Sequence, residues 1–343
     1  MPATILPRLA LLAAAGFLLA SPIAANDSEA EIGLGGIVLK PSSDLRLLSE
    51  DLFISEEKVT VDYVFENPTD DYVETTIAFP MPGQPRGLID TSYAYYDESQ
   101  DWSGFDFATR VDGRPVRLLQ YDRAMIGERD VTEEVIAHGF PVYWTATEDG
   151  NPFDGASPQR VAEALEKGLA RRDDPQFEGR VVPAWEGVTY FVREQSFAPR
   201  SKVRVSHEYA PMVGGSVGGA LYPQYRNNGE DSSLSEYRAR YCVDDHFLAG
   251  VDRRLAAKAS GENVQAWMHE TWIGYVLSSG ANWNGPIGTF RLVVDKGSTE
   301  NLVSFCMNGV TKIGPTQFEV VKTDFEPTRD LDILIVKFAS YED

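Results

Sequence analysis

The stretch Lys58-Val59-Thr60-Val61-Asp62-Tyr63-Val64-Phe65-Glu66 alternates between apolar and polar side chains. Its odd-numbered positions from 59 to 65 are all apolar, and three of its four even-numbered positions from 60 to 66 are polar. Successive side chains of a β-strand point to opposite faces, so this period predicts a strand with one buried face. The fold is therefore expected to be built from half-buried strands.

The same alternation continues on both sides of this stretch. The turn cluster Asn67-Pro68-Thr69-Asp70-Asp71 leads into residues 73–79, which predicts an antiparallel hairpin with 59–65. Residues 331–338 are apolar on both faces and predict a central strand. Further strands are expected at 105–111, with a turn at Asp112-Gly113 and a return at 116–119, at 203–209 and 290–294, at 302–313 as a hairpin around Asn308-Gly309, and at 318–320.

Helical patterns are fewer. Ser157 followed by Pro158 has the form of a helix start, with a capping hydroxyl and a proline in the first turn. Val161, Leu165 and Leu169 then form one apolar stripe, and the helix is expected to end near residues 171–172. Shorter helices are expected at 131–137 and 247–257.

This order of elements predicts a mainly β protein with two antiparallel β-sandwich-like units joined by a helical segment. The expected divisions are a leader at 1–25, an N-terminal β unit at 26–125, a mixed helical connection at 126–180 and a C-terminal β unit with a short helix at 181–343. The two β units could be separate domains or one continuous sandwich. The pattern of strands alone leaves both arrangements open.

Residues 1–25 have the three parts of a secretory signal peptide. Arg8 supplies a positive charge, residues 9–20 are almost wholly apolar, and small residues stand before Asn26. The apolar run is shorter than the ~20 residues that span a bilayer. We expect cleavage after Ala25, no later transmembrane segment, and a periplasmic or secreted protein.

Cys242 and Cys306 are the two cysteines of the chain. In an oxidising compartment they allow a single pairing, which predicts a disulfide that closes a loop of 64 positions. The alternative is two buried free thiols. A reactive thiol is not expected, because neither residue lies in a pattern that lowers a cysteine pKa.

The charge of the chain restricts its partners. It has 31 Lys and Arg against 52 Asp and Glu in 343 residues, a formal net charge of −21. Nucleic-acid binding needs clustered cations, so a nucleic-acid partner is not expected. The remaining candidates are a protein or a cell-envelope component, a cationic ligand, and calcium as a hard cation.

Catalytic patterns are weak. Gly214-Gly215-Ser216-Val217-Gly218 matches G-x-S-x-G, but residues 219–223 do not begin the helix that a hydrolase elbow requires. The candidates are Ser216 as the nucleophile, Asp244 or Asp245 as the acid, and His246 or His269 as the base. The alternative is a flexible β-connection. His207 is in phase with the apolar residues of its strand and is expected to be a hydrogen-bonded core histidine.

Oxygen-rich turns are candidates for calcium binding. Asp97 and Asp101 lie in one such turn, and Asp149 and Asp154 lie in another. Neither turn has the spacing of the twelve-residue calcium loop, and the alternative for both is a solvated loop. No histidine pair has a close metal-ligand spacing, so zinc is not predicted.

Two groups of aromatic residues are candidates for a contact surface. Tyr93, Tyr95, Tyr96 and Trp102 lie among acidic residues and are assigned to binding of a carbohydrate, a cationic ligand or a protein. For this group, core filling between sheets is an equal alternative. In the second group, which contains Trp267, Trp272, Tyr275 and Trp283, core filling is preferred for Trp272 and Tyr275.

Several short motifs, in this order, resemble a known family. They are Asn26-Asp27-Ser28, Gly35-Gly36, Glu50-Asp51-Leu52, the strand 59–65, Asn67-Pro68, Ala78-Phe79-Pro80-Met81-Pro82, Gly280-Ala281-Asn282-Trp283, Gly285-Pro286-Ile287-Gly288 and Val303-Ser304-Phe305-Cys306. Together they are similar to the bacterial secreted proteins grouped as domain-of-unknown-function family 4424. The resemblance implies a secreted β-rich protein and no particular activity. Residues 59–82 also resemble the vault/inter-alpha-trypsin domain, a β-sandwich of interaction and adhesion proteins.

The sequence therefore predicts a non-catalytic binding or scaffold protein of the periplasm or the exterior. Its partner would be a protein or an envelope component. The alternative is an envelope hydrolase that uses Ser216 with a distant histidine and aspartate.

Overall fold

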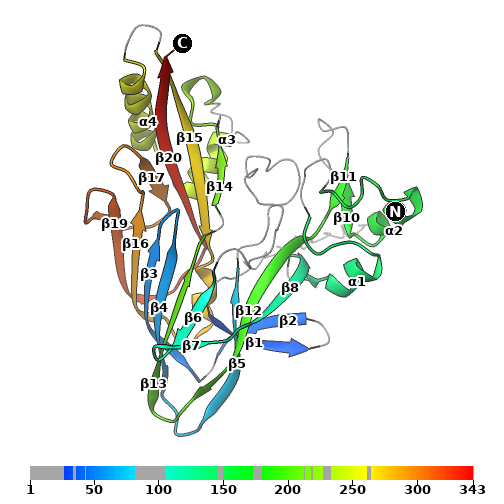
Figure 1. Ribbon diagram of the computed structural model, residues 1–343. Coiled ribbons are helices and arrows are strands. Elements are labelled where there is room, and N and C mark those ends of the chain that lie inside the picture. The colour runs from blue at the N-terminus through cyan, green and yellow to red at the C-terminus, as the bar shows by residue number, and fades with distance from the viewer. Residues whose placement is uncertain are drawn as a thin grey trace, which may run out of the picture.

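The computed structural model describes residues 27–33, 36–42, 44–81, 106–127, 129–144, 150–172, 180–211, 213–217, 219–226, 233–260 and 264–342. Strands make up most of the regular structure of these residues, so the predicted mainly β class is confirmed. In Figure 1 the C-terminal strands with α3 and α4 lie at one upper end of the molecule, and α1 and α2 lie at the other. Two larger sheets meet below them.

The described strands form three main sheets and one small one. The N-terminal sheet has the order β2 (Gly36–Lys40), β1 (Ser28–Gly33), β5 (Val73–Pro80), β12 (Glu186–Phe197), β8 (Leu119–Ile126) and β9 (Arg129–Asp130). The large sheet has the order β18 (Thr311–Lys312), β19 (Gln317–Phe325), β16 (Ile287–Asp295), β3 (Arg46–Ile54), β4 (Val59–Asn67), β13 (Ser201–Tyr209), β6 (Ala108–Val111) and β7 (Arg114–Val116).

The C-terminal sheet has the order β14 (Val213–Ser216), β15 (Val264–Tyr275), β20 (Leu331–Glu342) and β17 (Leu302–Phe305). The small sheet pairs β10 (Ala170–Arg172) with β11 (Val181–Pro183). The helices are α1 (Thr132–Ala137), α2 (Pro158–Glu166), α3 (Ser233–Tyr241) and α4 (Asp245–Lys258), with short 3₁₀ helices η4 (Pro223–Tyr225) and η5 (Ser278–Asn282).

The large sheet combines strands from both ends of the chain. β3 pairs with β16 in parallel, with Asp51 opposite Arg291. The other pairings in the described sheets are antiparallel, as expected. Strands of the two predicted β units thus share one sheet, and the domain boundaries at 125 and 180 stay a prediction.

The turn after β4 crosses between sheets. β4 pairs with β3 and β13, whereas β5 pairs with β1 and β12, so the predicted hairpin of 59–65 with 73–79 is wrong. The Asn67 side chain donates to the Asp71 carbonyl at 2.8 Å and to the Phe197 carbonyl at 3.0 Å. These bonds hold the turn after β4 beside the connection from β12 to β13, which also passes from the N-terminal sheet to the large sheet. Local alternation predicted both strands but could not predict their partners.

A second predicted hairpin is also wrong. Residues 302–313 were expected to fold back around Asn308-Gly309, but β17 pairs with β20 and β18 pairs with β19. The turn at Asp112-Gly113 joins β6 to β7 as predicted, with both residues at positive φ (48° and 76°). β20 lies between β15 and β17, so its prediction as a central strand is confirmed.

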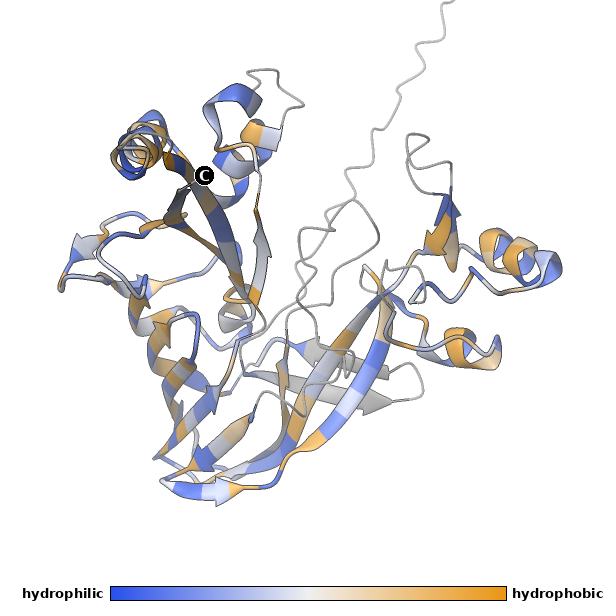
Figure 2. Cartoon of the chain, turned by 45° about the horizontal axis from the view of Figure 1, so that its top comes forward, coloured by the Kyte–Doolittle hydropathy of each residue, from blue (hydrophilic) through white to orange (hydrophobic). Residues whose placement is uncertain are grey.

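The main core lies where the apolar faces of the three sheets meet. The apolar side chains of β4 are at most 1% exposed on this face, so the alternation that opens the sequence marks the core. Figure 2 shows hydrophobic and hydrophilic residues alternating along the strands of the large sheet. The most buried large side chains of the main core are Tyr63, Phe65, Phe79, Phe197, Tyr275 and Phe290.

A separate small core lies at the far end of β8 and β12. Trp185 is 0% exposed, its indole donates to the Val142 carbonyl at 2.9 Å, and the Trp144 indole donates to the Trp185 carbonyl at 2.9 Å. α2 begins after Ser157, whose hydroxyl accepts from the Arg160 amide as predicted. It ends at Glu166 rather than near 171, because Gly168 at φ 69° turns the chain into β10.

α3 and α4 cover one face of the C-terminal sheet, and the other face joins the main core. Cys242 directly follows α3 and is bonded to Cys306, which directly follows β17, with the two Cα atoms 5.1 Å apart. The predicted disulfide is confirmed. α3 itself was not predicted, since it lacks a regular apolar stripe.

Candidate functional site

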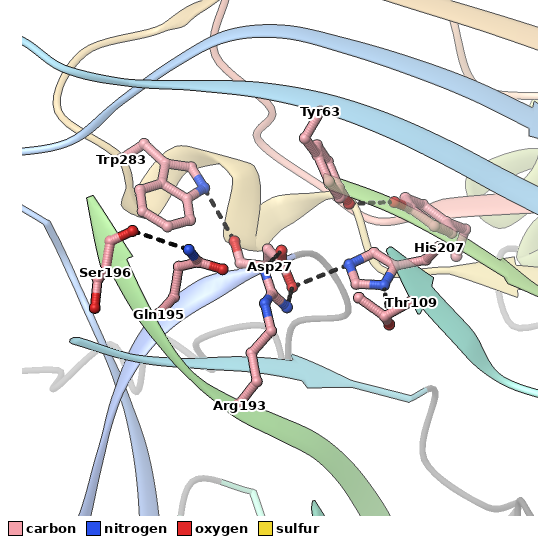
Figure 3. A network of polar contacts seen from close by, with 9 residues as sticks. Asp27, Tyr63, Thr109, Arg193, Gln195, Ser196, His207 and Trp283 are labelled. Carbon is pink, nitrogen blue, oxygen red and sulfur yellow. Dashed lines mark hydrogen bonds and ion pairs between the residues drawn. The ribbon is translucent and has the colours of Figure 1, made fainter. Parts of the chain in front are cut away.

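A buried carboxylate lies at the junction of the two larger sheets. Asp27 precedes β1 and is 0% exposed, and Arg193 of β12 is 5% exposed. The Arg193 guanidinium donates to Asp27 through both terminal nitrogens, from Nη1 to Oδ1 at 3.1 Å and from Nη2 to Oδ2 at 2.6 Å (Figure 3). Such a two-point contact is the strong form of an arginine–carboxylate pair.

His207 extends this network into the large sheet. Its Nε2 lies 3.3 Å from Asp27 Oδ1, and its Nδ1 lies 2.7 Å from the Thr109 hydroxyl on the neighbouring strand β6 (Figure 3). The Nε2 contact does not have the alignment of a hydrogen bond. An alcohol, an imidazole and a carboxylate therefore follow one another in the order of a nucleophile, a base and an acid.

This network is buried within the main core. Thr109 and His207 are 3% and 2% exposed, and the rings of Tyr63, Phe79 and Phe107 pack around the imidazole. A catalytic nucleophile must be reached by the reacting group, and these side chains fill the approach. The network is thus a polar centre of the core, and His207 is the buried core histidine that the sequence predicts.

The charges in this centre are set by burial and by pairing. Burial by itself would raise the pKa of Asp27, but Arg193 and His207 outweigh it, and the net result is a lowered pKa. Burial lowers the pKa of His207, and the opposite effect of Asp27 does not compensate for it. The stable state is an ionised Asp27–Arg193 pair beside a neutral imidazole.

The backbone of Asp27 and the neighbouring Ser28 also form hydrogen bonds with distant residues. The Trp283 indole donates to the Asp27 carbonyl at 2.9 Å, and the Asn282 amide donates to the Ser28 hydroxyl at 3.0 Å. Asp27 therefore contacts the N-terminal sheet, the large sheet and the chain around η5. Sequence reasoning gave Asp27 no such role, because an isolated aspartate beside the predicted leader has no local signal of burial.

A second buried carboxylate lies on β15. Glu270 is 2% exposed, and its Oε2 accepts from the Tyr237 hydroxyl at 2.5 Å and from the Trp272 indole at 3.2 Å. Its other oxygen, Oε1, is buried and has no hydrogen-bond partner among the described residues. A buried polar atom without a partner is uncommon in folded proteins and requires an explanation.

The environment of Glu270 favours its neutral form. Burial raises its pKa from 4.5 to about 7, and the hydrogen bonds from Tyr237 and Trp272 only reduce this rise. Among the described residues, no cation is one of the groups that shift this pKa. Glu270 therefore changes its charge near neutral pH, which is the property of many functional carboxyl groups.

The glycine-rich segment lies directly against Glu270. β14 pairs with β15, and Ser216 is opposite Glu270 in this ladder. A Cβ atom on Gly215 would stand 2.5 Å from the Glu270 carbonyl oxygen, and one on Gly219 would stand 2.2 Å from Glu270 Oε1. Glycine is therefore required at both positions, because this segment packs closely against β15. The alternative of a flexible β-connection did not include this constraint.

The family model DUF4424, a domain of unknown function, matches residues 25–334. The chain is a member of the DUF4424 family. The predicted resemblance to this family is confirmed, and the likeness of residues 59–82 to the vault/inter-alpha-trypsin domain receives no support.

No curated protein matches this DUF4424 chain. Among solved structures, a putative nutrient binding protein from Legionella pneumophila is similar, with 16% identity and a TM-score of 0.42 over 86% of this chain and 68% of that one. An M1 zinc metallopeptidase from Deinococcus radiodurans has 9% identity and a TM-score of 0.27 over 86% of this chain and 43% of that one. Likenesses at this level carry no functional conclusion.

In the DUF4424 protein the predicted catalytic candidates lie on three different elements, β14, α4 and β15. Ser216 lies opposite Glu270, His246 lies in the first turn of α4, and His269 is adjacent to Glu270 on β15 and so faces the other side of that sheet. Ser216 is followed by a bend and turns rather than a helix, which is not the geometry of a hydrolase elbow. A catalytic role for these three residues stays a prediction.

The environment of His269 differs from that of Glu270. Burial, followed by the nearby charge of Lys337, lowers the pKa of His269. Its ring lies 5.5 Å from the ring of Trp267 on the same face of β15. Lys337 also pairs with Glu56, which accepts a hydrogen bond from Thr271 at 3.2 Å.

Most of the predicted binding residues lie outside the described part of the chain. These are Tyr93, Tyr95, Tyr96 and Trp102, together with the calcium candidates Asp97, Asp101 and Asp149. The fourth calcium candidate, Asp154, pairs with Arg180 and accepts from the Asn151 amide at 2.9 Å. Its carboxylate is thus already neutralised by a protein cation, and no cluster of three metal-binding side chains occurs in the described ranges.

In the second aromatic group, the two residues that were expected to fill the core are buried. Trp272 and Tyr275 are 7% and 1% exposed, which confirms the expectation for these two residues. Among the described residues, no helix has the length and apolar character needed to cross a membrane.

Proposed function

We propose that this DUF4424 protein is a non-catalytic ligand-binding protein that acts outside the cytoplasm, with the surroundings of Glu270 as its recognition site. The observation that carries this proposal is the Glu270 oxygen Oε1, which is buried beside a glycine-rich segment and has no hydrogen-bond partner among the described residues. Leaving such an atom unpaired costs about 1–3 kcal/mol, so a bound partner that satisfies it would gain affinity. Glu270 also lies on β15, which is paired on both sides, with β14 and with β20, so its backbone is held within the sheet.

The reasons for preferring binding to catalysis are structural. The one nucleophile–base–acid sequence seen in the described residues, Thr109–His207–Asp27, is enclosed by aromatic side chains. Glu270 has neutral hydrogen-bond donors beside it, in the form of Tyr237 and Trp272. Such groups fix and orient a ligand, which is the typical composition of a binding site.

Two observations support an extracytoplasmic location. The Cys242–Cys306 disulfide joins α3 to the end of β17, and disulfides persist mainly in oxidising compartments. The leader pattern of residues 1–25 points to the same route.

The test compares the purified protein with its Glu270→Gln and Glu236→Gln variants. Glu236 is an exposed residue of α3 next to Tyr237, so its substitution makes the same change of charge outside the site. Each protein is incubated with a small-molecule extract of the cell envelope, and native mass spectrometry measures bound mass. We expect an adduct on the parent and on E236Q that is lost on E270Q. Equal adduct patterns in all three proteins, or none in any, would contradict the proposal.

A second candidate function rests on the position of Ser216 opposite Glu270. In this alternative the protein is an envelope hydrolase with Ser216 as the nucleophile and a distant His/Asp pair. A fluorophosphonate probe reacts covalently with an activated serine. Labelling of the parent that is lost in Ser216→Ala would support the hydrolase, and equal labelling of both would remove it.

A further inference from the structure

We propose that the ligand recognised at Glu270 is a compact organic cation with N–H donors, such as a primary ammonium, bound through Oε1. This inference rests on the proposed function and adds the chemical class of the ligand. The residues that define the site are Glu270, Tyr237, Trp272 and Gly219.

The distribution of hydrogen bonds over the carboxyl group points to a donor. Both protein donors, the Tyr237 hydroxyl and the Trp272 indole, bind the same oxygen, Oε2. Oε1 is left without a bond in the described part of the site. When Glu270 is ionised, its carboxylate only accepts hydrogen bonds, so in this form the missing partner of its second oxygen is an N–H or O–H group.

The charges near Glu270 favour a cation over a neutral donor. The titratable groups that affect Glu270 or the Tyr237 beside it are Tyr237 itself, Tyr241 and Glu236, all on α3. None of these groups carries a positive charge. A cationic ligand would supply the positive charge that Arg193 supplies to Asp27. The net charge of −21 also raises the local concentration of cations around the protein.

Aromatic residues lie on one side of the carboxyl group, where Tyr237 and Trp272 donate to Oε2. The rings of Tyr237 and Trp272 are 6.4 Å apart and meet edge to face, and Tyr241 lies 5.5 Å from Tyr237. Aromatic faces attract ammonium groups through their quadrupoles, and a carboxylate among such rings is a suitable environment for an ammonium.

Gly219 limits the size of the group that can bind. A Cβ atom at this position would lie 2.2 Å from Oε1 and 2.9 Å from the carboxyl carbon of Glu270. The Gly219 backbone therefore packs close to Oε1, and a side chain at 219 would clash with the carboxyl group. A compact head group such as an ammonium fits this restriction better than a planar guanidinium.

Because Glu270 changes its protonation near neutral pH, the pH dependence of the binding affinity distinguishes between ligand classes. A cation binds the ionised carboxylate, and with a pKa of about 7 the ionised fraction falls roughly 30-fold between about pH 8 and about pH 5.5. The affinity for a cation should fall by the same factor. A ligand that accepts a hydrogen bond from the protonated acid would bind roughly 10-fold more tightly at the lower pH.

The experiment is a calorimetric titration of the purified protein with ethylammonium chloride at about pH 8 and about pH 5.5, at constant ionic strength. Tetramethylammonium chloride has the charge without N–H donors and serves as the ligand control. We expect saturable ethylammonium binding at the higher pH, a roughly 30-fold loss at the lower pH, and weaker binding of tetramethylammonium. Equal binding of both cations, or tighter binding at the lower pH, would overturn the inference.

Variants separate recognition from folding. Glu270→Gln should abolish ethylammonium binding, and Glu236→Gln should leave it unchanged. Gly219→Ala keeps Glu270 and places a methyl group against Oε1, so it should also abolish binding even if Glu270→Gln proves unstable. Retained binding in the folded Gly219→Ala protein would contradict the site.

The outcomes also distinguish this inference from the proposed function. If ethylammonium does not bind but the envelope extract gives an adduct that depends on Glu270, the ligand class is wrong and the binding function stands. If neither ethylammonium nor the extract gives a Glu270-dependent signal, both are wrong.

Discussion

Asp27 and Glu270 are both buried carboxyl groups, with 0% and 2% exposure, yet their pKa values move in opposite directions. Burial raises the pKa of each. Arg193, with a two-point contact, and His207 overcome this effect at Asp27, whereas the donors to Glu270 among the described residues are the neutral groups of Tyr237 and Trp272. The comparison shows that the presence of a paired cation, rather than the depth of burial, decides the charge of a core carboxyl group.

The two sites also differ in their place in the fold. Asp27 lies where two large sheets and η5 meet, and its polar partners come from the surrounding chain. Glu270 lies under β14, a short edge strand, and the helix α3. A charge-paired network at a junction stabilises the fold, whereas a buried carboxyl group whose described donors are neutral, near an edge, is suited to an external partner.

The largest expected effect comes from removing the cation of the Asp27 site. Arg193→Met leaves a buried carboxylate without its paired charge, so the free energy of unfolding should fall by about 3–5 kcal/mol. Urea denaturation followed by circular dichroism measures it. If Arg193→Met costs no more than a surface substitution, the pair does not hold the junction.

The double variant Asp27→Leu/Arg193→Met sharpens this result. It removes both charges together, so it should recover much of the loss, because a buried ion pair is often replaced by apolar residues without a large net cost. Arg200→Met is the matched control. Arg200 pairs with Asp70 at an exposed site, so its loss should leave the denaturation midpoint unchanged.

The second effect concerns the dependence of stability on pH at Glu270. Its pKa is about 7 in the folded chain and ordinarily 4.5. Between these two pH values, the folded state therefore binds the proton of Glu270 more strongly than the unfolded state does. The stabilisation is complete below the lower value and is lost as the pH rises through the upper one. Relative to Glu270→Gln, the parent should lose up to about 3 kcal/mol across this window.

Denaturation of both proteins at several pH values measures this difference. The parent curve should fall with rising pH relative to the E270Q curve, and Glu236→Gln should follow the parent. Parallel curves for the parent and E270Q would mean that the Glu270 carboxyl group is not perturbed. The contrast with Asp27 would then disappear.

The smallest effect concerns the glycine that faces Glu270. Gly219→Ala places a methyl group against Oε1 and should destabilise the protein by about 1–3 kcal/mol through overpacking. In a Glu270→Ala background the cost should shrink, because the contact is gone, and a double-mutant cycle by urea denaturation measures the coupling.

Gly274 provides the control for this cycle. It lies on the same strand, β15, and a Cβ at 274 would meet no atom within 4 Å. Gly274→Ala should therefore be neutral or stabilising by up to about 1 kcal/mol. An equal cost at 219 and 274 would show that general backbone effects, rather than the approach to Glu270, explain the requirement for glycine.

The sequence predicted local elements better than their partners. The alternation at 59–65 and 203–209 predicted β4 and β13 together with their buried faces, and Ser157-Pro158 predicted the start of α2. The pairing of β4 with β3 and β13, rather than with β5, depends on contacts distant in the chain. Alternation reports which face of a strand is buried but not which strand lies beside it.

The candidate site was predictable only in part. The glycine-rich segment around Ser216 was recognised, but Glu270 was not, because a single glutamate between His269 and Thr271 has no local mark of burial. Its phase with Met268 and Trp272 on β15 is a signal that could have suggested an inward-facing carboxyl group. Tyr237, which binds Glu270, lies 33 positions away in a helix that the pattern did not reveal.

By itself, the sequence determined the mainly β class, the single disulfide, the acidic charge and the membership of DUF4424. These properties follow from residue composition, period and short motifs, which are local. The tertiary structure alone decided that strands from both ends of the chain share one sheet and that two carboxyl groups are buried in different electrostatic surroundings. The reason is that pKa values and strand partners depend on groups brought together across the fold, and distance in space cannot be read from order in the chain.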